Sequence, residues 1–217
     1  MRNNDKLDKK TWILTTIVCL LPVIAGIILL PKLPDQVATH WDAQGNVNGT
    51  QSKFTAAVVF PGILAVVNFF FPALLKMDPK YENMSKKVVN VIWWIIPVVA
   101  LVCSAFTLAN GLGIAVDAAL AAPLLCGFIF IVVGNYMPKM SQTYTVGIKL
   151  PWTLHDEENW NKTHRMAGFL WVVCGMLILV SAFLPYPFNT YIMSAAFVAM
   201  VAVPCLYSYL LYRKSGK

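Results

Sequence analysis

The sequence has few charged residues, which make up 12% of its 217 positions, about half the share in an average soluble domain. Hydrophobic residues make up 58%, above the roughly 45–50% of soluble proteins. So little charge excludes a water-soluble globular protein, and so apolar a chain cannot stay solvated as a disordered one. Five cysteines are too few for a disulfide scaffold. An integral membrane protein is the class that remains.

Six long stretches of the chain contain no Asp, Glu, Lys, Arg or His. A hydrocarbon core about 30 Å thick needs roughly 20 apolar residues in helical form, and each stretch has about that length. A single segment in lipid must satisfy its own backbone hydrogen bonds, so all six are predicted to be helices. The fold class is therefore all-α, a polytopic membrane protein with six transmembrane helices in one membrane domain, 1–217. The predicted spans are 12–30, 54–75, 88–109, 118–137, 166–184 and 190–212.

Positive charge is unevenly divided between the two sides of the membrane. Fifteen of the 17 Lys and Arg residues fall in the two terminal tails and in the connections 76–87 and 138–165. The other three connections hold only Lys32 and Lys53. Because cytoplasmic loops carry an excess of Lys and Arg, both the N and the C terminus are predicted to be cytoplasmic in a multi-pass cell-membrane protein. The same bias accounts for the net charge of +7 without a nucleic-acid partner.

The outer loop, 31–53, is one of two connections too long to be simple turns. Residues 37–41 are rich in β-formers, and residues 42–49 are rich in Asn and Gly, which favour tight turns. We expect a short extended segment and a turn over the outer membrane surface. The candidate binding residues of this loop are His40, Trp41, Asp42 and Gly45, although a lone histidine such as His40 is more often a structural hydrogen-bonding residue.

The inner loop, 138–165, is the second long connection. Its later part is predicted to start a helix, because Thr153 can cap it and residues 156–158 place acidic charge where the helix dipole favours it. Two tryptophans suggest that this lead-in lies in the headgroup region before the fifth span. Its candidate binding residues are Lys149, Trp152, Glu157, Trp160, His164 and Arg165.

No pattern indicates a metal, a cofactor or catalysis. The acidic and amide residues after position 41 alternate like calcium ligands, but Val47 stands where that loop needs Gly and Lys53 where it needs Glu. His155 and His164 are nine residues apart, which does not fit the zinc motif His-Glu-x-x-His, and His40 lies across the bilayer. Neither side holds a complete set of acid, base and nucleophile. We therefore predict a protein that is not an enzyme and holds no cofactor.

Two strings of residues resemble the signatures of a known family. The outer string consists of Leu33-Pro34, Val37, His40, Gly45 and Ser52-Lys53. The inner string, which is the more specific, consists of Gly134-Asn135, Met137-Pro138-Lys139, Gly147-Ile148, Pro151-Trp152-Thr153-Leu154, Glu157, Trp160, Thr163-His164-Arg165 and Gly168. On these residues the chain resembles the SdpI-like membrane proteins, which include immunity proteins against a secreted killing peptide of spore-forming bacteria. It departs from the inner signature at Thr143, Lys149 and Leu150.

The resemblance implies a non-enzymatic protein that protects the cell from a membrane-active toxin peptide, met on the outer side or within the membrane. In some relatives the protein also captures a transcriptional repressor at the cytoplasmic face, which gives the inner loop an expected partner. A small transporter is the alternative, because prolines interrupt five of the spans as in broken helices. No span carries the ionisable residue that an ion-coupled transporter needs. A metal-dependent membrane enzyme is the less favoured alternative.

The charge bias generates a direct test of topology. A reporter fused after Lys217 and one inserted near Lys80 are expected to read as cytoplasmic, because both lie on the basic side. A reporter inserted near Gly45 is expected to read as external. Paired phosphatase and fluorescent-protein fusions measure both states, and an external C terminus would overturn every argument that depends on sidedness.

Overall fold

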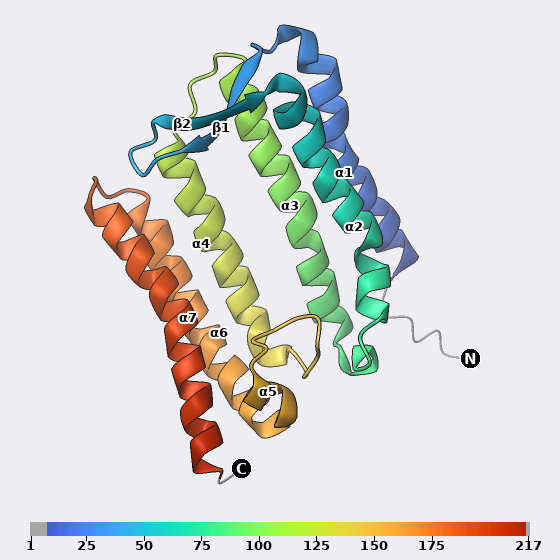
Figure 1. Ribbon diagram of the computed structural model, residues 1–217, viewed down its shortest axis with the longest axis vertical. Coiled ribbons are helices and arrows are strands. Elements are labelled where there is room, and N and C mark those ends of the chain that lie inside the picture. The colour runs from blue at the N-terminus through green and yellow to red at the C-terminus, as the bar shows by residue number, and fades with distance from the viewer. Residues whose placement is uncertain (1–7, 216–217) are drawn as a thin grey trace. The chain divides into compact units, whose positions relative to one another are not determined.

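The computed structural model describes residues 8–215, so the tail residues Arg2, Lys6 and Lys217 lie outside the described part. Six helices of the described part are long and apolar enough to cross a membrane, which confirms the predicted all-α, six-span class (Figure 1). They contain α1 (Lys9–Leu29), α2 (Phe60–Lys76), α3 (Lys86–Gly111), α4 (Ala118–Tyr136), α6 (Glu157–Ser181) and α7 (Phe188–Lys214). The span of α2 also includes the helical turn before it and runs from Thr55 to Lys76. The sidedness of the termini stays a prediction.

Short elements join these helices. They are 3-10 turns at Leu30–Lys32, Tyr81–Asn83 and Met137–Lys139, the antiparallel strands β1 (Gln36–Trp41) and β2 (Val47–Ser52), a π-helical turn at Thr55–Val59, and the short helix α5 (Pro151–His155). The expected extended segment is β1. The second strand was missed, because its Asn and Gly residues favour turns when read alone.

The chain divides into two compact units, each described here by itself. The first comprises residues 1–73 and 89–121, and the second comprises residues 74–88 and 122–217. In the first unit, Cys19, Ala65 and Ala100 bring α1, α2 and α3 together. Such small side chains allow close helix approach, which matters in lipid because burying apolar side chains there yields little driving force.

A close backbone contact joins α1 to the start of α2. Pro61 has no N–H to donate to the carbonyl of Ala57, four residues earlier, and the chain makes a π-helical turn here. Gly26 of α1 packs against that carbonyl so closely that a Cβ at position 26 would lie 1.9 Å from the Ala57 oxygen. Only glycine fits at this crossing.

The second unit relies on glycine and on buried polar groups. α4 and α6 approach at two glycine pairs, Gly127 with Gly175 and Gly134 with Gly168, where an added Cβ would lie 2.6–2.8 Å from the facing backbone oxygen. On the other side of α6, Asn159 donates to the Ser208 carbonyl of α7 at 2.9 Å and accepts from the Ser208 hydroxyl at 2.8 Å. Figure 1 shows α6 and α7 running side by side.

The predicted lead-in and the fifth span form one helix. We expected the later part of the inner loop to start a helix and to enter a span at 166–184, and α6 is continuous from Glu157 to Ser181. Asp156 caps it, accepting hydrogen bonds from the N–H groups of Glu158 and Asn159 at 2.9 and 3.1 Å. Thr153 does not cap this helix. Its hydroxyl accepts the Leu150 N–H at 2.8 Å and so caps α5 instead.

The Gly26 contact predicts that an added methyl group destabilises the protein at position 26 but not at position 62. Gly26→Ala forces α1 away from the Ala57 carbonyl, and overpacking of this kind costs about 1–3 kcal/mol. Gly62→Ala in α2 is the matched control, because nothing lies within 4 Å of an added Cβ there. Thermal unfolding in detergent should show a lower midpoint for Gly26→Ala only. Equal midpoints for the two variants would contradict the close contact.

Candidate functional site

The β1–β2 hairpin holds the four candidate residues of the outer loop. Its turn is organised by Asp42, whose Oδ1 accepts the N–H groups of Gln44 and Asn46 at 2.9 and 2.8 Å. Gly45 supplies the positive φ of 85° that the turn needs. The roles of Asp42 and Gly45 in the structure are therefore to shape the hairpin tip.

His40 and Trp41 differ in their surroundings. His40 is exposed, and its Nδ1 lies 2.5 Å from Asn48 Oδ1 across the hairpin, next to an irregularity in the strand pairing. Trp41 is half-buried and forms a T-shaped contact with Phe106 of α3, with ring centroids 4.9 Å apart. The hairpin thus shows an imidazole to solvent and is anchored through its tryptophan.

The base of the hairpin is fixed by an apolar cluster. Val37 is 1% exposed, and Leu33 packs beside it with Leu108 and two alanines of the π-helical turn. Asp35 and Lys53 close the base with an ion pair of 2.9 Å, and this hydrogen-bonded pairing lowers the pKa of the Asp35 carboxyl. The hairpin is therefore an ordered surface and not a loose loop.

The inner loop is held by a carboxylate from another part of the chain. Asp78 Oδ2 accepts the N–H groups of Tyr144 and Thr145 at 2.8 Å each and the Thr145 hydroxyl at 2.6 Å. Its Oδ1 accepts the Lys80 N–H at 2.8 Å. Burial alone raises the pKa of Asp78, but these hydrogen bonds to the charged form outweigh it and hold the pKa below its ordinary value.

A second group of contacts closes the loop onto α5. The Gln142 amide donates to the carbonyls of Thr153 and Leu154 at 2.7 and 2.9 Å, and its oxygen accepts from the Lys80 ammonium. Thr143, one of the departures from the family signature, is buried and bonds the Val146 carbonyl at 2.8 Å. Lys149, another departure, is exposed and reaches the Thr145 carbonyl at 3.3 Å.

Trp160 and His164 lie in the interior. Their exposed fractions are 0% and 1%, and their rings stack with centroids 4.0 Å apart. His164 Nε2 accepts the Ile148 N–H at 2.9 Å, and the Trp160 indole donates to the Met140 carbonyl at 2.8 Å. The expectation that Trp160 anchors the lead-in at the headgroup level is therefore wrong, because it packs under the loop. Gly147, at φ 120°, leaves room for both rings.

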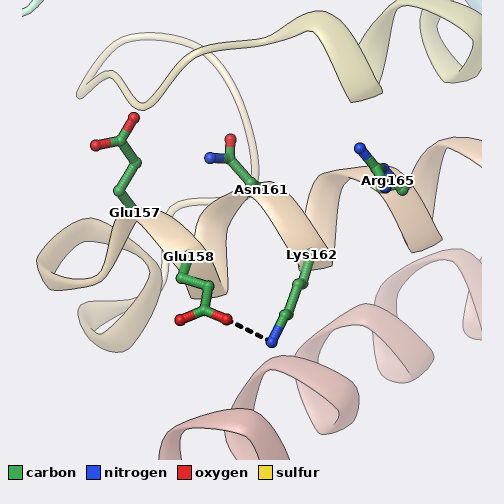
Figure 2. A pocket seen from close by; sticks show the side chains of 5 residues that line it. All are labelled: Glu157, Glu158, Asn161, Lys162 and Arg165. Atoms are coloured by element: carbon green, nitrogen blue, oxygen red, sulfur yellow. Dashed lines mark ion pairs between the residues drawn. The ribbon is translucent and has the colours of Figure 1, made fainter.

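The remaining candidates of the inner loop lie on its surface or edge. Trp152 is half-buried against α7, with its ring centroid 5.5 Å from that of Tyr209 and 5.9 Å from that of Tyr212. Glu157 and Arg165 are exposed and line a shallow pocket on the first turns of α6 (Figure 2). The structure brings these two together in one pocket and separates them from the buried pair Trp160 and His164.

Asp78 is the residue that sequence reasoning missed. The connection 76–87 was interpreted only through its four lysines, so the acidic residues within it were not considered. The available signal was Asp78 itself, an acidic residue followed by Pro79 in an otherwise basic segment. Among the described residues, no group of three or more His, Cys, Asp or Glu side chains could hold a metal ion.

Two family models match the parts of the chain that contain the two loops. Residues 139–208 match the SdpI/YfhL protein family, and residues 17–65 match a domain of unknown function (DUF1648). The chain is 28% identical over 206 residues to the "Immunity protein SdpI" of Bacillus subtilis (strain 168), across 95% of this chain and 97% of that protein. No solved structure matches the chain. The resemblance to the SdpI-like family is thereby confirmed, and the matched segments include the hairpin and most of the inner loop.

The Asp78 contacts predict a pH-dependent inner loop. Asp78→Asn leaves an amide N–H₂ facing backbone donors, and losing hydrogen bonds to a charged group costs about 1.5–3 kcal/mol. Limited proteolysis at pH 7 should cut within residues 140–150 faster in this variant. Because the folded-state pKa is lowered, the stabilisation is complete above the ordinary Asp value of about 3.9 and is lost as pH falls through the lower folded value.

The control for this prediction is Asp35→Asn. Asp35 also forms a polar pairing, but its side chain is 92% exposed, so its loss should leave cleavage of the inner loop unchanged. Asp78→Asn should also flatten the acid-side change in cleavage that the unmodified protein shows. Identical cleavage profiles for both variants would contradict the role of Asp78.

Proposed function

We propose that this multi-pass membrane protein, a relative of the SdpI-like immunity proteins, protects the cell from a secreted, membrane-active toxin peptide. The observation that carries the proposal is the similarity to an immunity protein along nearly the whole length of both chains. A match of this extent includes both loops and all six helices. It therefore supports a shared role for the whole molecule and not only a shared fragment.

The β1–β2 hairpin is the surface proposed to meet the peptide. In the predicted topology it lies on the outer side, where a secreted peptide arrives. Its turn is ordered by Asp42, so the exposed His40 and the half-buried Trp41 are presented in a fixed arrangement. Preorganised surfaces bind at a lower entropic cost than loose loops do. We assign contact with the peptide to Trp41, and to His40 the positioning of Asn48 through their hydrogen bond.

The inner loop is proposed to meet a cytoplasmic protein, such as a transcriptional repressor. Its backbone is held by Asp78 and Gln142, whereas Tyr144 and Lys149 are exposed on it. A rigid segment with exposed aromatic and charged side chains is suited to protein recognition. The buried pair Trp160 and His164 would support this surface from below without touching the partner.

The contacts of Asn68 favour a role in helix packing over a role in transport. Asn68, the mid-span polar residue that a transporter would use, is fully buried, and its amide donates to Thr15 at 3.2 Å and Thr16 at 3.4 Å. Hydrogen bonds of this kind are typical of helix packing in lipid. Asn68 is therefore assigned to the α1–α2 contact.

A protection assay tests the proposal. The chain is expressed in a host sensitive to the peptide of an SdpI-bearing bacterium, and the peptide concentration that halves survival is measured. We expect protection by the unmodified protein, and at least a tenfold loss with Trp41→Ala, as for an aromatic contact at the centre of an interface. His40→Gln should have a smaller effect, because glutamine can still bond Asn48.

Ile114→Ala is the matched control for Trp41→Ala. Ile114 is 58% exposed in a connection predicted to lie on the same side of the membrane, and it is not part of the hairpin. Membrane levels of all variants are compared by quantitative blotting. Absence of protection by the unmodified protein would overturn the proposed function. Silent Trp41 and His40 variants would instead place recognition within the spans.

A further inference from the structure

A charged pocket lies on the first turns of α6, and the buried ring pair Trp160 and His164 is not part of its lining. It is lined by Glu157, Glu158, Asn161, Lys162 and Arg165. Figure 2 shows Glu157, Asn161 and Arg165 following one another along the helix, with Glu158 and Lys162 joined beneath them by an ion pair of 2.6 Å. The pocket therefore contains charges of both signs in a defined order.

Two of these charges have no partner within the described residues. Glu158 and Lys162 neutralise each other, but the side chains of Glu157 and Arg165 form no ion pair or hydrogen bond there. They are eight residues apart, about 12 Å along the axis, and Asn161 lies between them. The pocket thus offers a carboxylate acceptor at Glu157, a guanidinium donor at Arg165 and an amide between them at Asn161.

The surface of α6 continues from this pocket as an exposed apolar face. Phe169, Met176 and Val180 are 75%, 48% and 59% exposed. They follow Arg165 at spacings of four, seven and four residues, which places all of them on one face of the helix. Along α6 the charged pocket is followed by an apolar face, just as the headgroup of a phospholipid is followed by its acyl chains.

We propose that this pocket binds the headgroup of a zwitterionic aminophospholipid, phosphatidylethanolamine. The phosphate pairs with the Arg165 guanidinium, which can bind two oxygens at once, and the ammonium pairs with the Glu157 carboxylate. Asn161 donates its amide N–H to a phosphate oxygen, and the acyl chains cover Phe169 and Met176.

The polarity of the helix matches the polarity of this lipid. In phosphatidylethanolamine the phosphate lies nearer the hydrocarbon core and the ammonium lies farther out. Arg165 likewise precedes the apolar part of α6, and Glu157 lies two turns farther out. This match holds whichever side of the membrane α6 begins on, so it does not depend on the predicted topology or on the proposed function.

Two other common headgroups fit less well. Phosphatidylglycerol has no cation for Glu157 and adds negative charge beside Glu158. Phosphatidylcholine has a cation, but its trimethylammonium group has no N–H to donate to a carboxylate. The pocket should therefore prefer phosphatidylethanolamine over both.

Native mass spectrometry of the full-length protein tests this preference. The protein is exchanged into nanodiscs that contain equal parts of the three lipids, and the lipids retained after release are counted. We expect retained phosphatidylethanolamine to exceed phosphatidylcholine several-fold. Glu157→Gln should abolish that preference, and Arg165→Gln should reduce retention of phosphatidylethanolamine about tenfold, as expected when a charge-assisted contact is lost.

Arg213→Gln, at the exposed C-terminal end of α7, is the matched control and should retain lipid as the unmodified protein does. Arg165→Lys keeps the charge and should restore part of the retention, which separates lipid binding from misfolding. Thermal unfolding checks that each variant is folded. Equal retention of the three lipids, preference for phosphatidylglycerol, or wild-type ratios in Glu157→Gln would each overturn the proposal, the last leaving the pocket to a protein ligand.

Discussion

Hydrogen bonds between buried polar groups of distant segments are the interaction on which the rest of this structure depends. In lipid, or beneath a closed loop, an amide or carboxylate can bond only to other groups of the chain. Asn68 bonds the threonines of α1, Asn159 bonds Ser208 of α7, and Asp78 gathers the donors of the inner loop. Each of these contacts joins segments distant in sequence. Together they fix helix pairs and a loop that apolar packing alone would leave free to slide, since lipid tails are as apolar as the helix surfaces.

The helices were predictable because their signal is local. A run of uncharged residues of membrane length must be helical, and five of the six expected spans coincide with observed helices to within a few residues. The start of α6 was not predictable in this way, since Glu157, Glu158 and Lys162 are too polar for a span. The helix continues through them because Asp156 caps it and Asn159 and Trp160 are buried by contacts from α7 and the inner loop.

The sequence indicated the two loops of the candidate site but not the contacts of their residues, whose binding roles stay predictions. Family resemblance pointed to both loops, and the composition around Asp42 and Gly45 indicated a turn. Which side chains face outward depends on partners far along the chain. From the sequence, Trp160 is expected to be an interfacial tryptophan. In the structure it is buried, because its indole donates to the Met140 carbonyl and its ring stacks on His164. From the sequence, Asp78 is expected to be a solvated loop residue. In the structure it accepts hydrogen bonds from Tyr144 and Thr145, which lie 66 and 67 positions away.

The Asp78 contact makes the two basic connections of the second unit depend on each other. Tyr144 and Thr145 of the inner loop donate to a carboxylate that belongs to the connection 76–87. A peptide copied from residues 138–165 alone would lack that acceptor and lose these three hydrogen bonds. Transplanting the inner loop into another protein would therefore require both connections.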